Sequence, residues 1–128
     1  MFSHVTIGSN DIDRSKKFYD ALFGAVGGKP GSVDAKGRLL YFHNGGLLML
    51  TKPIDGKAAT HANGGTIGFT MAGPEEAEAW HNAGVANGGK SIEDPPGVRQ
   101  GGGGPLYLAY IRDPDGNKLC ALHRIKAA

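Results

Sequence analysis

The feature that most constrains the fold is a turn near the end of the chain, between two apolar segments. The turn is Asp113-Pro114-Asp115-Gly116-Asn117, and residues 106–112 and 118–123 flank it. Proline fixes φ, aspartate and asparagine bond neighbouring backbone groups, and glycine accepts positive φ, so this sequence is typical of a tight turn. We therefore predict a closing pair of strands that this turn connects.

Length and charge exclude several classes of protein. A chain of 128 residues suits one compact domain with its own core. The net charge is +2, charges of both signs are interspersed, and no run of Lys and Arg exceeds two residues, so the sequence does not predict a nucleic-acid-binding protein. The single cysteine, Cys120, excludes an intrachain disulfide and a cysteine-based zinc site.

The sequence predicts a cytoplasmic protein that does not bind membranes. The first residues lack the basic and long apolar regions of a signal peptide. No apolar run approaches the ~18–20 residues that a membrane-spanning helix needs. The single cysteine is compatible with a reducing compartment.

Hydrophobic periodicity divides the chain into two similar halves. The first half predicts a strand over 2–8, a helix over 12–23, a short edge strand over 25–32, a strand over 37–43, a turn at Asn44-Gly45-Gly46 and a strand over 47–51. The second half predicts a strand over 66–71, a helix from Pro74 to about 87, a short edge strand over 90–93, a glycine-rich loop over 94–105 and the closing pair of strands.

Each half thus has the order strand–helix–strand–strand–strand, although the halves share little residue identity. We predict an α+β fold of two βαβββ modules whose curved mixed sheets form a cleft. The expected organisation is a single domain over 1–128, with modules over about 1–53 and 65–125 and a linker over 54–64.

This pattern resembles the vicinal oxygen chelate superfamily, which contains glyoxalase I, bleomycin-resistance proteins and extradiol dioxygenases. Three parts of the chain carry the resemblance: residues 4–19 with His4-Val5-Thr6-Ile7 and Phe18-Tyr19, residues 66–69, and the turn over 112–117. The resemblance covers essentially the whole chain. It implies paired modules, often a homodimer, and a cleft that holds a divalent ion such as Zn, Ni, Mn or Fe in the metal enzymes.

The family's four metal ligands are His and Glu, and they come from the first and last strands of each module. In this sequence the matching positions hold His4, Met49, Thr66 and Cys120. Only His4 is a clear ligand for such an ion. The glutamates all lie in the second helix or in the strand after it, so the sequence argues against a complete glyoxalase or extradiol dioxygenase site.

Further residues are candidates for a ligand pocket, each with an ordinary structural alternative. Tyr41, His43 and Tyr110 lie on predicted strands and could line the pocket or pack in the core. Arg99 could bind an anion from the glycine-rich loop, or lie in solvent at its tip. Cys120 could be a cleft thiol, but a buried apolar role is favoured because no base is adjacent in sequence.

The hypothesis that best fits these observations is a glyoxalase-like homodimer that binds a small organic molecule in the inter-module cleft and has an incomplete metal site. His4 could act as a general base in a lyase or isomerase reaction. One alternative is a metal-dependent lyase, isomerase or dioxygenase with an atypical site that uses His4 and Cys120. A second alternative is a drug-sequestering protein, although the few acids on strands disfavour a cationic ligand.

Overall fold

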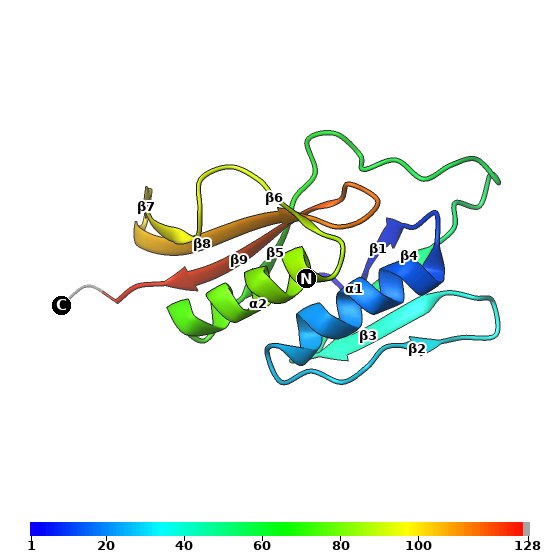
Figure 1. Ribbon diagram of the computed structural model, residues 1–128, viewed down its shortest axis with the longest axis horizontal. Coiled ribbons are helices and arrows are strands. Elements are labelled where there is room, and N and C mark those ends of the chain that lie inside the picture. The colour runs from blue at the N-terminus through cyan, green and yellow to red at the C-terminus, as the bar shows by residue number, and fades with distance from the viewer. Residues whose placement is uncertain (127–128) are drawn as a thin grey trace.

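The computed structural model describes residues 1–126 and contains two helices and two mixed β-sheets (Figure 1). This is the α+β architecture that the sequence predicts. In chain order, the elements are β1 (Val5–Gly8), α1 (Ile12–Gly24), β2 (Ser32–Val33), β3 (Leu39–His43), β4 (Gly46–Thr51), β5 (Ile67–Thr70), α2 (Pro74–Ala86), β6 (Lys90–Ser91), β7 (Gly97–Gly101), β8 (Gly104–Arg112) and β9 (Lys118–Arg124).

Sheet A consists of the first four strands, in the order β1-β4-β3-β2. β1 is parallel to β4, whereas β3 is antiparallel to both of its neighbours. The β3–β4 turn is the predicted one: Asn44 and Gly45 have φ of 46° and 81°, which asparagine and glycine tolerate. The first strand begins at Val5 and not at residue 2, so His4 lies just outside the sheet.

Helix α1 connects β1 to β2 and buries one stripe of its surface. Asp11 caps its N-terminus by accepting a hydrogen bond from the Arg14 backbone N–H. The buried residues recur at the three- and four-residue spacing of an amphipathic helix: Ser15, Phe18, Tyr19, Leu22 and Phe23.

Sheet B has the order β5-β9-β8-β6, and β7 also pairs with β8. The prediction of a loop over 94–105 is wrong in this region, because β7 and β8 form a hairpin around Gly102 and Gly103. Glycine has low strand propensity, and the flanking glycines leave only Val98, Arg99 and Gln100 to show the alternation of a strand. The second module therefore has one strand more than the βαβββ pattern predicts.

The turn over 113–117 forms as predicted and also connects the two modules. Oδ1 of Asp113 accepts backbone hydrogen bonds from Asp115 and Asn117, at 2.9 and 2.8 Å. The Asp115 carboxylate accepts from the backbone N–H of Asn10 and from Nη2 of Arg14, at 2.9 and 2.7 Å. Asn117 donates to the carbonyl oxygen of Gly8 at 3.1 Å. Residues more than one hundred positions apart are thereby fixed against each other.

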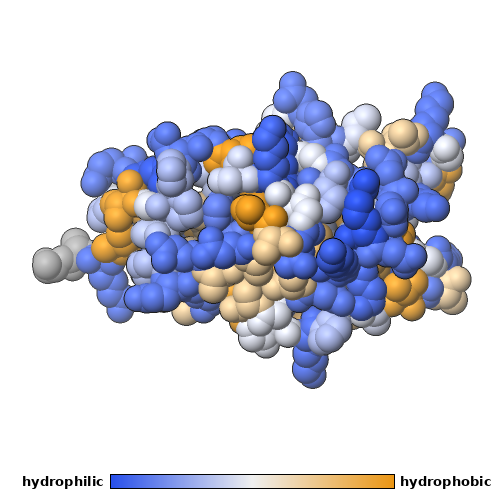
Figure 2. Space-filling view, in the orientation of Figure 1, coloured by the Kyte–Doolittle hydropathy of each residue, from blue (hydrophilic) through white to orange (hydrophobic). Residues whose placement is uncertain are grey.

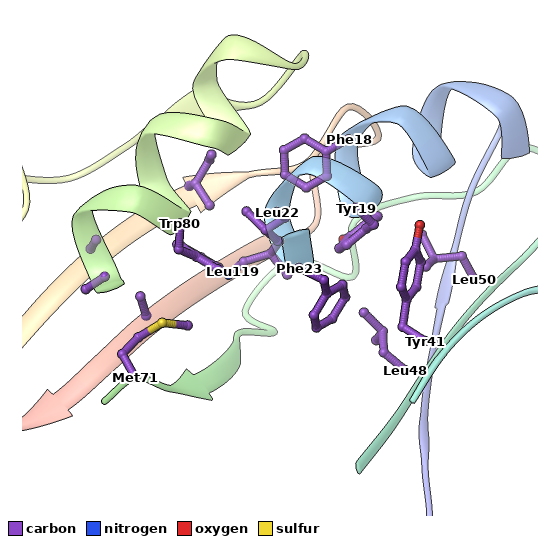
Figure 3. Packing of buried hydrophobic residues seen from close by; sticks show 14 of the residues in the cluster. Phe18, Tyr19, Leu22, Phe23, Tyr41, Leu48, Leu50, Met71, Trp80 and Leu119 are labelled. Atoms are coloured by element: carbon purple, nitrogen blue, oxygen red, sulfur yellow. The ribbon is translucent and has the colours of Figure 1, made fainter. Parts of the chain in front are cut away.

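One hydrophobic cluster contains residues from both modules. Figure 3 shows Phe18, Leu22 and Phe23 of α1 near Trp80 of α2 and Leu119 of β9. Within residues 1–126, no helix is long and apolar enough to cross a membrane.

Both helices lie on the near side of their sheets in Figure 1. The same side is largely hydrophilic in Figure 2. The opposite face of each sheet carries no helix among the residues described, and we call these surfaces the sheet A face and the sheet B face. Alternation along the strands decides which side chains belong to these faces.

Candidate functional site

The sheet B face brings together three of the residues that the sequence singles out. Gly68 of β5, Cys120 of β9 and Tyr110 of β8 are register partners across three adjacent strands, so they form one row. Arg99 of β7 pairs with Leu106 of β8 and therefore lies on the same face as Tyr110. We define the site as Gly68, Arg99, Tyr110, Lys118 and Cys120.

Cys120 forms the floor of this site. Its residue surface is only 5% exposed, and burial raises the pKa of its thiol. A neutral, buried thiol is a poor nucleophile, because the thiolate is the reactive form. The structure therefore favours a packing role for Cys120 over covalent catalysis.

Tyr110 is the register partner of Cys120, and the ammonium group of Lys118 lies over its ring. Burial, followed by the neighbouring thiol, raises the pKa of the Tyr110 hydroxyl, which is therefore a neutral donor at physiological pH. The ammonium group of Lys118 lies 4.9 Å from the ring centroid, within cation–π distance. Lys118 also forms an ion pair with Glu93, which offsets its charge.

Arg99 contributes a positive charge, and its guanidinium group is hydrogen-bonded to backbone carbonyl groups. Its Nη1 donates to the carbonyl oxygens of Gly97 and Leu108 at 3.0 and 3.5 Å, and its Nη2 donates to that of Asp94 at 2.8 Å. Within residues 1–126, none of the ion pairs involves Arg99. The guanidinium group is thus oriented while its charge is not neutralised by a carboxylate.

The remaining predicted residues are outside the site as defined. Met49 is on the sheet A face, paired in register with Thr6 and Leu40. His4 is exposed just before β1, and its Nδ1 is 2.8 Å from the Ser3 hydroxyl oxygen. Thr66 is exposed and immediately precedes β5.

Tyr41 and His43 lie on the helix-bearing side of sheet A. The Tyr41 hydroxyl donates to Oδ1 of Asp20 at 2.7 Å, and its ring stacks on Phe23 at 4.8 Å in the core. Both residues also line a cavity of about 180 Å³ between the modules, with Ile67 and Phe69 on its other side. Gly68 also lines this cavity, so the cavity adjoins the site at Gly68, although Tyr41 and His43 lie on the opposite side of their sheet from its free face.

The residues present do not fit the divalent ion of the metal enzymes. The four matching positions supply one imidazole, a thioether, a hydroxyl and a buried thiol, whereas such ions take His and carboxylate ligands. Within residues 1–126, no group of three or more His, Cys, Asp or Glu side chains could hold a metal ion.

Two members of the site, Gly68 and Lys118, were not among the predicted residues. Lys118 could have been found from alternation alone, since it is two residues before Cys120 on the same strand. A Cβ built on Gly68 meets nothing within 4 Å, so this glycine leaves open space beside Cys120. No sequence signal distinguishes such a glycine from those in turns.

Comparison with known proteins places the chain in a family. The family described as the glyoxalase/bleomycin resistance protein/dioxygenase superfamily matches residues 1–121. The chain belongs to this superfamily. A crystal structure of a glyoxalase/bleomycin resistance protein from Albidiferax ferrireducens T118 is 56% identical, with a TM-score of 0.92, and the match covers 97% of this chain and 99% of that one.

More distant solved structures share the fold. A lactoylglutathione lyase from Agrobacterium tumefaciens is 20% identical, with a TM-score of 0.67 and coverage of 96% of this chain and 92% of that one. A glyoxalase-related enzyme from Fulvimarina pelagi is 21% identical, with a TM-score of 0.73 and coverage of 97% and 88%. A search of curated proteins finds no match.

Proposed function

We propose that this superfamily member binds a small organic molecule on the sheet B face, without a metal ion of the kind used by the metal enzymes. The observation that carries the proposal is the row Gly68–Cys120–Tyr110, which has open space at one end and a hydroxyl donor at the other. An apolar floor with a few polar groups that fix orientation is the usual composition of a small-molecule site. Leu106 and Leu122 supply further partly exposed apolar surface on this face.

Binding is favoured over a lyase or isomerase reaction that uses His4 as general base. His4 is exposed and lies just before β1 of sheet A, whereas the row of site residues belongs to sheet B. A general base must come within hydrogen-bond reach of the proton that it removes. A metal-dependent reaction through His4 and Cys120 is disfavoured because the other two matching positions hold a thioether and a hydroxyl in place of carboxylate or imidazole ligands.

Three further parts of the proposal rest on sequence and resemblance. Modules over about 1–53 and 65–125, linked by 54–64, act as one domain with one core. The protein works in the cytoplasm, where a free thiol such as Cys120 stays reduced. Two copies of the chain associate as a homodimer, in agreement with what the family resemblance implies.

The space beside Gly68 provides a direct test of the binding proposal. Gly68→Val fills that space, and it should be tolerated because valine favours strands and the added Cβ meets no atom within 4 Å. A library of small organic molecules would be screened by ¹H–¹⁵N NMR for shifts of the Gly68, Tyr110 and Cys120 amides. We expect hits on the wild-type protein that weaken at least about tenfold in Gly68→Val.

Thr6→Val is the matched control, because Thr6 lies on the other free sheet face, on the edge strand β1. It should leave the affinities of the hits unchanged. The proposal fails if no compound shifts the amides of the sheet B face, or if Gly68→Val binds the hits as well as the wild-type protein does.

A further inference from the structure

The charges around Cys120 define what kind of molecule the sheet B face can accept. Three charged side chains act on the Cys120 thiol: Glu93, Lys118 and Arg99. Lys118 and Glu93 form an ion pair with each other. The positive charge of Arg99 therefore remains as the net charge of this group.

The protein already holds the guanidinium group of Arg99 in one orientation. Arg99 is half-buried, and its three hydrogen bonds to backbone carbonyl oxygens fix the plane of the guanidinium group. These bonds leave further N–H donors of the group without a partner among residues 1–126. Carbonyl oxygens orient the guanidinium but carry no formal charge to neutralise it, whereas a carboxylate can accept two parallel hydrogen bonds from it.

The guanidinium group of Arg99 lies close to its own strand. Its Nη1 would be in van der Waals contact with a Cβ built on Gly97, at 3.4 Å. The group is next to Leu108 and near Tyr110.

We propose that the sheet B face selects small organic monoanions, in particular carboxylates, with the carboxylate bound by Arg99 and the apolar body lying toward Tyr110 and the open space at Gly68. The inference rests on the proposed small-molecule site and adds the class of ligand. One net positive charge matches one carboxylate. Lys118 is already paired with Glu93, whereas no carboxylate among residues 1–126 forms an ion pair with Arg99. A cationic ligand would be repelled.

Three probes of nearly equal shape separate charge from shape: benzoate, benzamide and benzamidinium, which carry charges of −1, 0 and +1. Their dissociation constants would be measured by ¹H–¹⁵N NMR titration of the full chain at fixed ionic strength. We expect benzoate to bind at least about tenfold more tightly than benzamide, and benzamidinium to bind most weakly. The shifts should map to the amides of Arg99, Tyr110 and Cys120.

Variants of Arg99 test the assignment to this residue. Arg99→Gln should weaken benzoate at least about tenfold and leave benzamide unchanged, while Arg99→Lys should retain part of the preference because it keeps the charge without the planar fork. Arg124→Gln is the matched control, since Arg124 flanks Leu106 on the same face from the other side and is exposed. It should change the affinity for benzoate less than about threefold.

Each contrary result has a distinct meaning. If benzamide or benzamidinium binds the sheet B face as tightly as benzoate, the monoanion inference is overturned while the proposed binding site stands. If Arg99→Gln and Arg124→Gln lose the same affinity for benzoate, the role of Arg99 is overturned, because the attraction of benzoate to the face would then be non-specific. If none of the three probes shifts the sheet B amides, the inference is overturned, and the proposed function is decided separately by its own library and the Gly68→Val variant.

Discussion

Tyr19 and Tyr107 each donate a hydrogen bond to a carboxylate, and the two carboxylates differ in burial. The hydroxyl of Tyr19, which is fully buried, donates to Oδ2 of Asp113 at 2.6 Å. Tyr107 donates to Oε1 of Glu78 at the same distance, but Glu78 is exposed. Burial raises the pKa of Asp113 even though several hydrogen bonds act in the opposite direction, so its carboxylate depends strongly on its remaining donors.

We therefore predict that Tyr19→Phe lowers the free energy of unfolding by about 2 kcal/mol, because a buried acceptor loses a donor that water cannot replace. Tyr107→Phe, the matched control, should cost less than about 1 kcal/mol, since water can reach Glu78. Urea denaturation at neutral pH measures both values. Equal losses in the two variants would show that the Tyr19–Asp113 bond has no special importance for the connection between the modules.

Part of the candidate site follows from the sequence at the residue scale. Once residues 106–112 and 118–123 are taken as paired strands, alternation places Tyr110 and Cys120 on the same face. Arg99 could be named as an anion-binding residue, but its surroundings could not, since they depend on carbonyl groups of Asp94 and Leu108 that only tertiary structure brings together. The pairing of Lys118 with Glu93 also could not be predicted, because Glu93 has a positive φ of 59° that redirects the chain.

At the scale of elements, the contact between the two helices depends on a glycine within α2. A Cβ built on Gly84 would lie 2.4 Å from Cδ1 of Ile111 and 3.1 Å from Cδ1 of Leu22. A Cβ on Gly89 would meet the same Ile111 atom at 2.8 Å. The Ile111 methyl group therefore fills space that two glycines leave, and Ile111 itself is fully buried.

Gly84→Ala should destabilise the protein by up to about 2 kcal/mol. Alanine gains about 1 kcal/mol in helix propensity, but overpacking a filled core costs about 1–3 kcal/mol, and Ile111 cannot move without leaving a void. Gly24→Ala is the control, because a Cβ at the last residue of α1 meets nothing within 4 Å. It should be neutral or slightly stabilising. Thermal unfolding of both variants would contradict this reasoning if Gly84→Ala were the more stable of the two.

The elements differ in how well the sequence predicts them. Helix α1 has both a capping aspartate and a regular buried stripe, and the predicted range differs from the observed one only at its C-terminal end. Strand β7 was missed because its side chains alternate over only three positions between two glycines. Strand β2 is only two residues long, since Gly27, Gly28 and Pro30 precede it and weaken strand structure.

For the whole molecule, the important consequence is that each sheet has one face without a helix. The sheet A face is apolar, with Leu40 paired to Met49 and Phe42 paired to Leu47. Phe42 is 68% exposed. Contiguous exposed apolar residues on a sheet are typical of an association surface. The sheet B face instead carries the polar and charged side chains of Arg99, Tyr110 and Lys118.

We predict that the homodimer forms through the sheet A face and that Phe42→Asp disrupts it. A carboxylate at this position would be costly to bury against a second apolar surface. Sedimentation equilibrium should give twice the chain mass of 13.3 kDa for the wild-type protein and a shift toward the monomer mass for Phe42→Asp. Ile54→Asp is the matched control, because Ile54 is fully exposed in the segment between the modules, away from both sheets, and its replacement should leave the dimer intact. A monomeric wild-type protein would contradict the prediction, and so would a Phe42→Asp variant that remains dimeric, which would place the interface on another surface of the molecule.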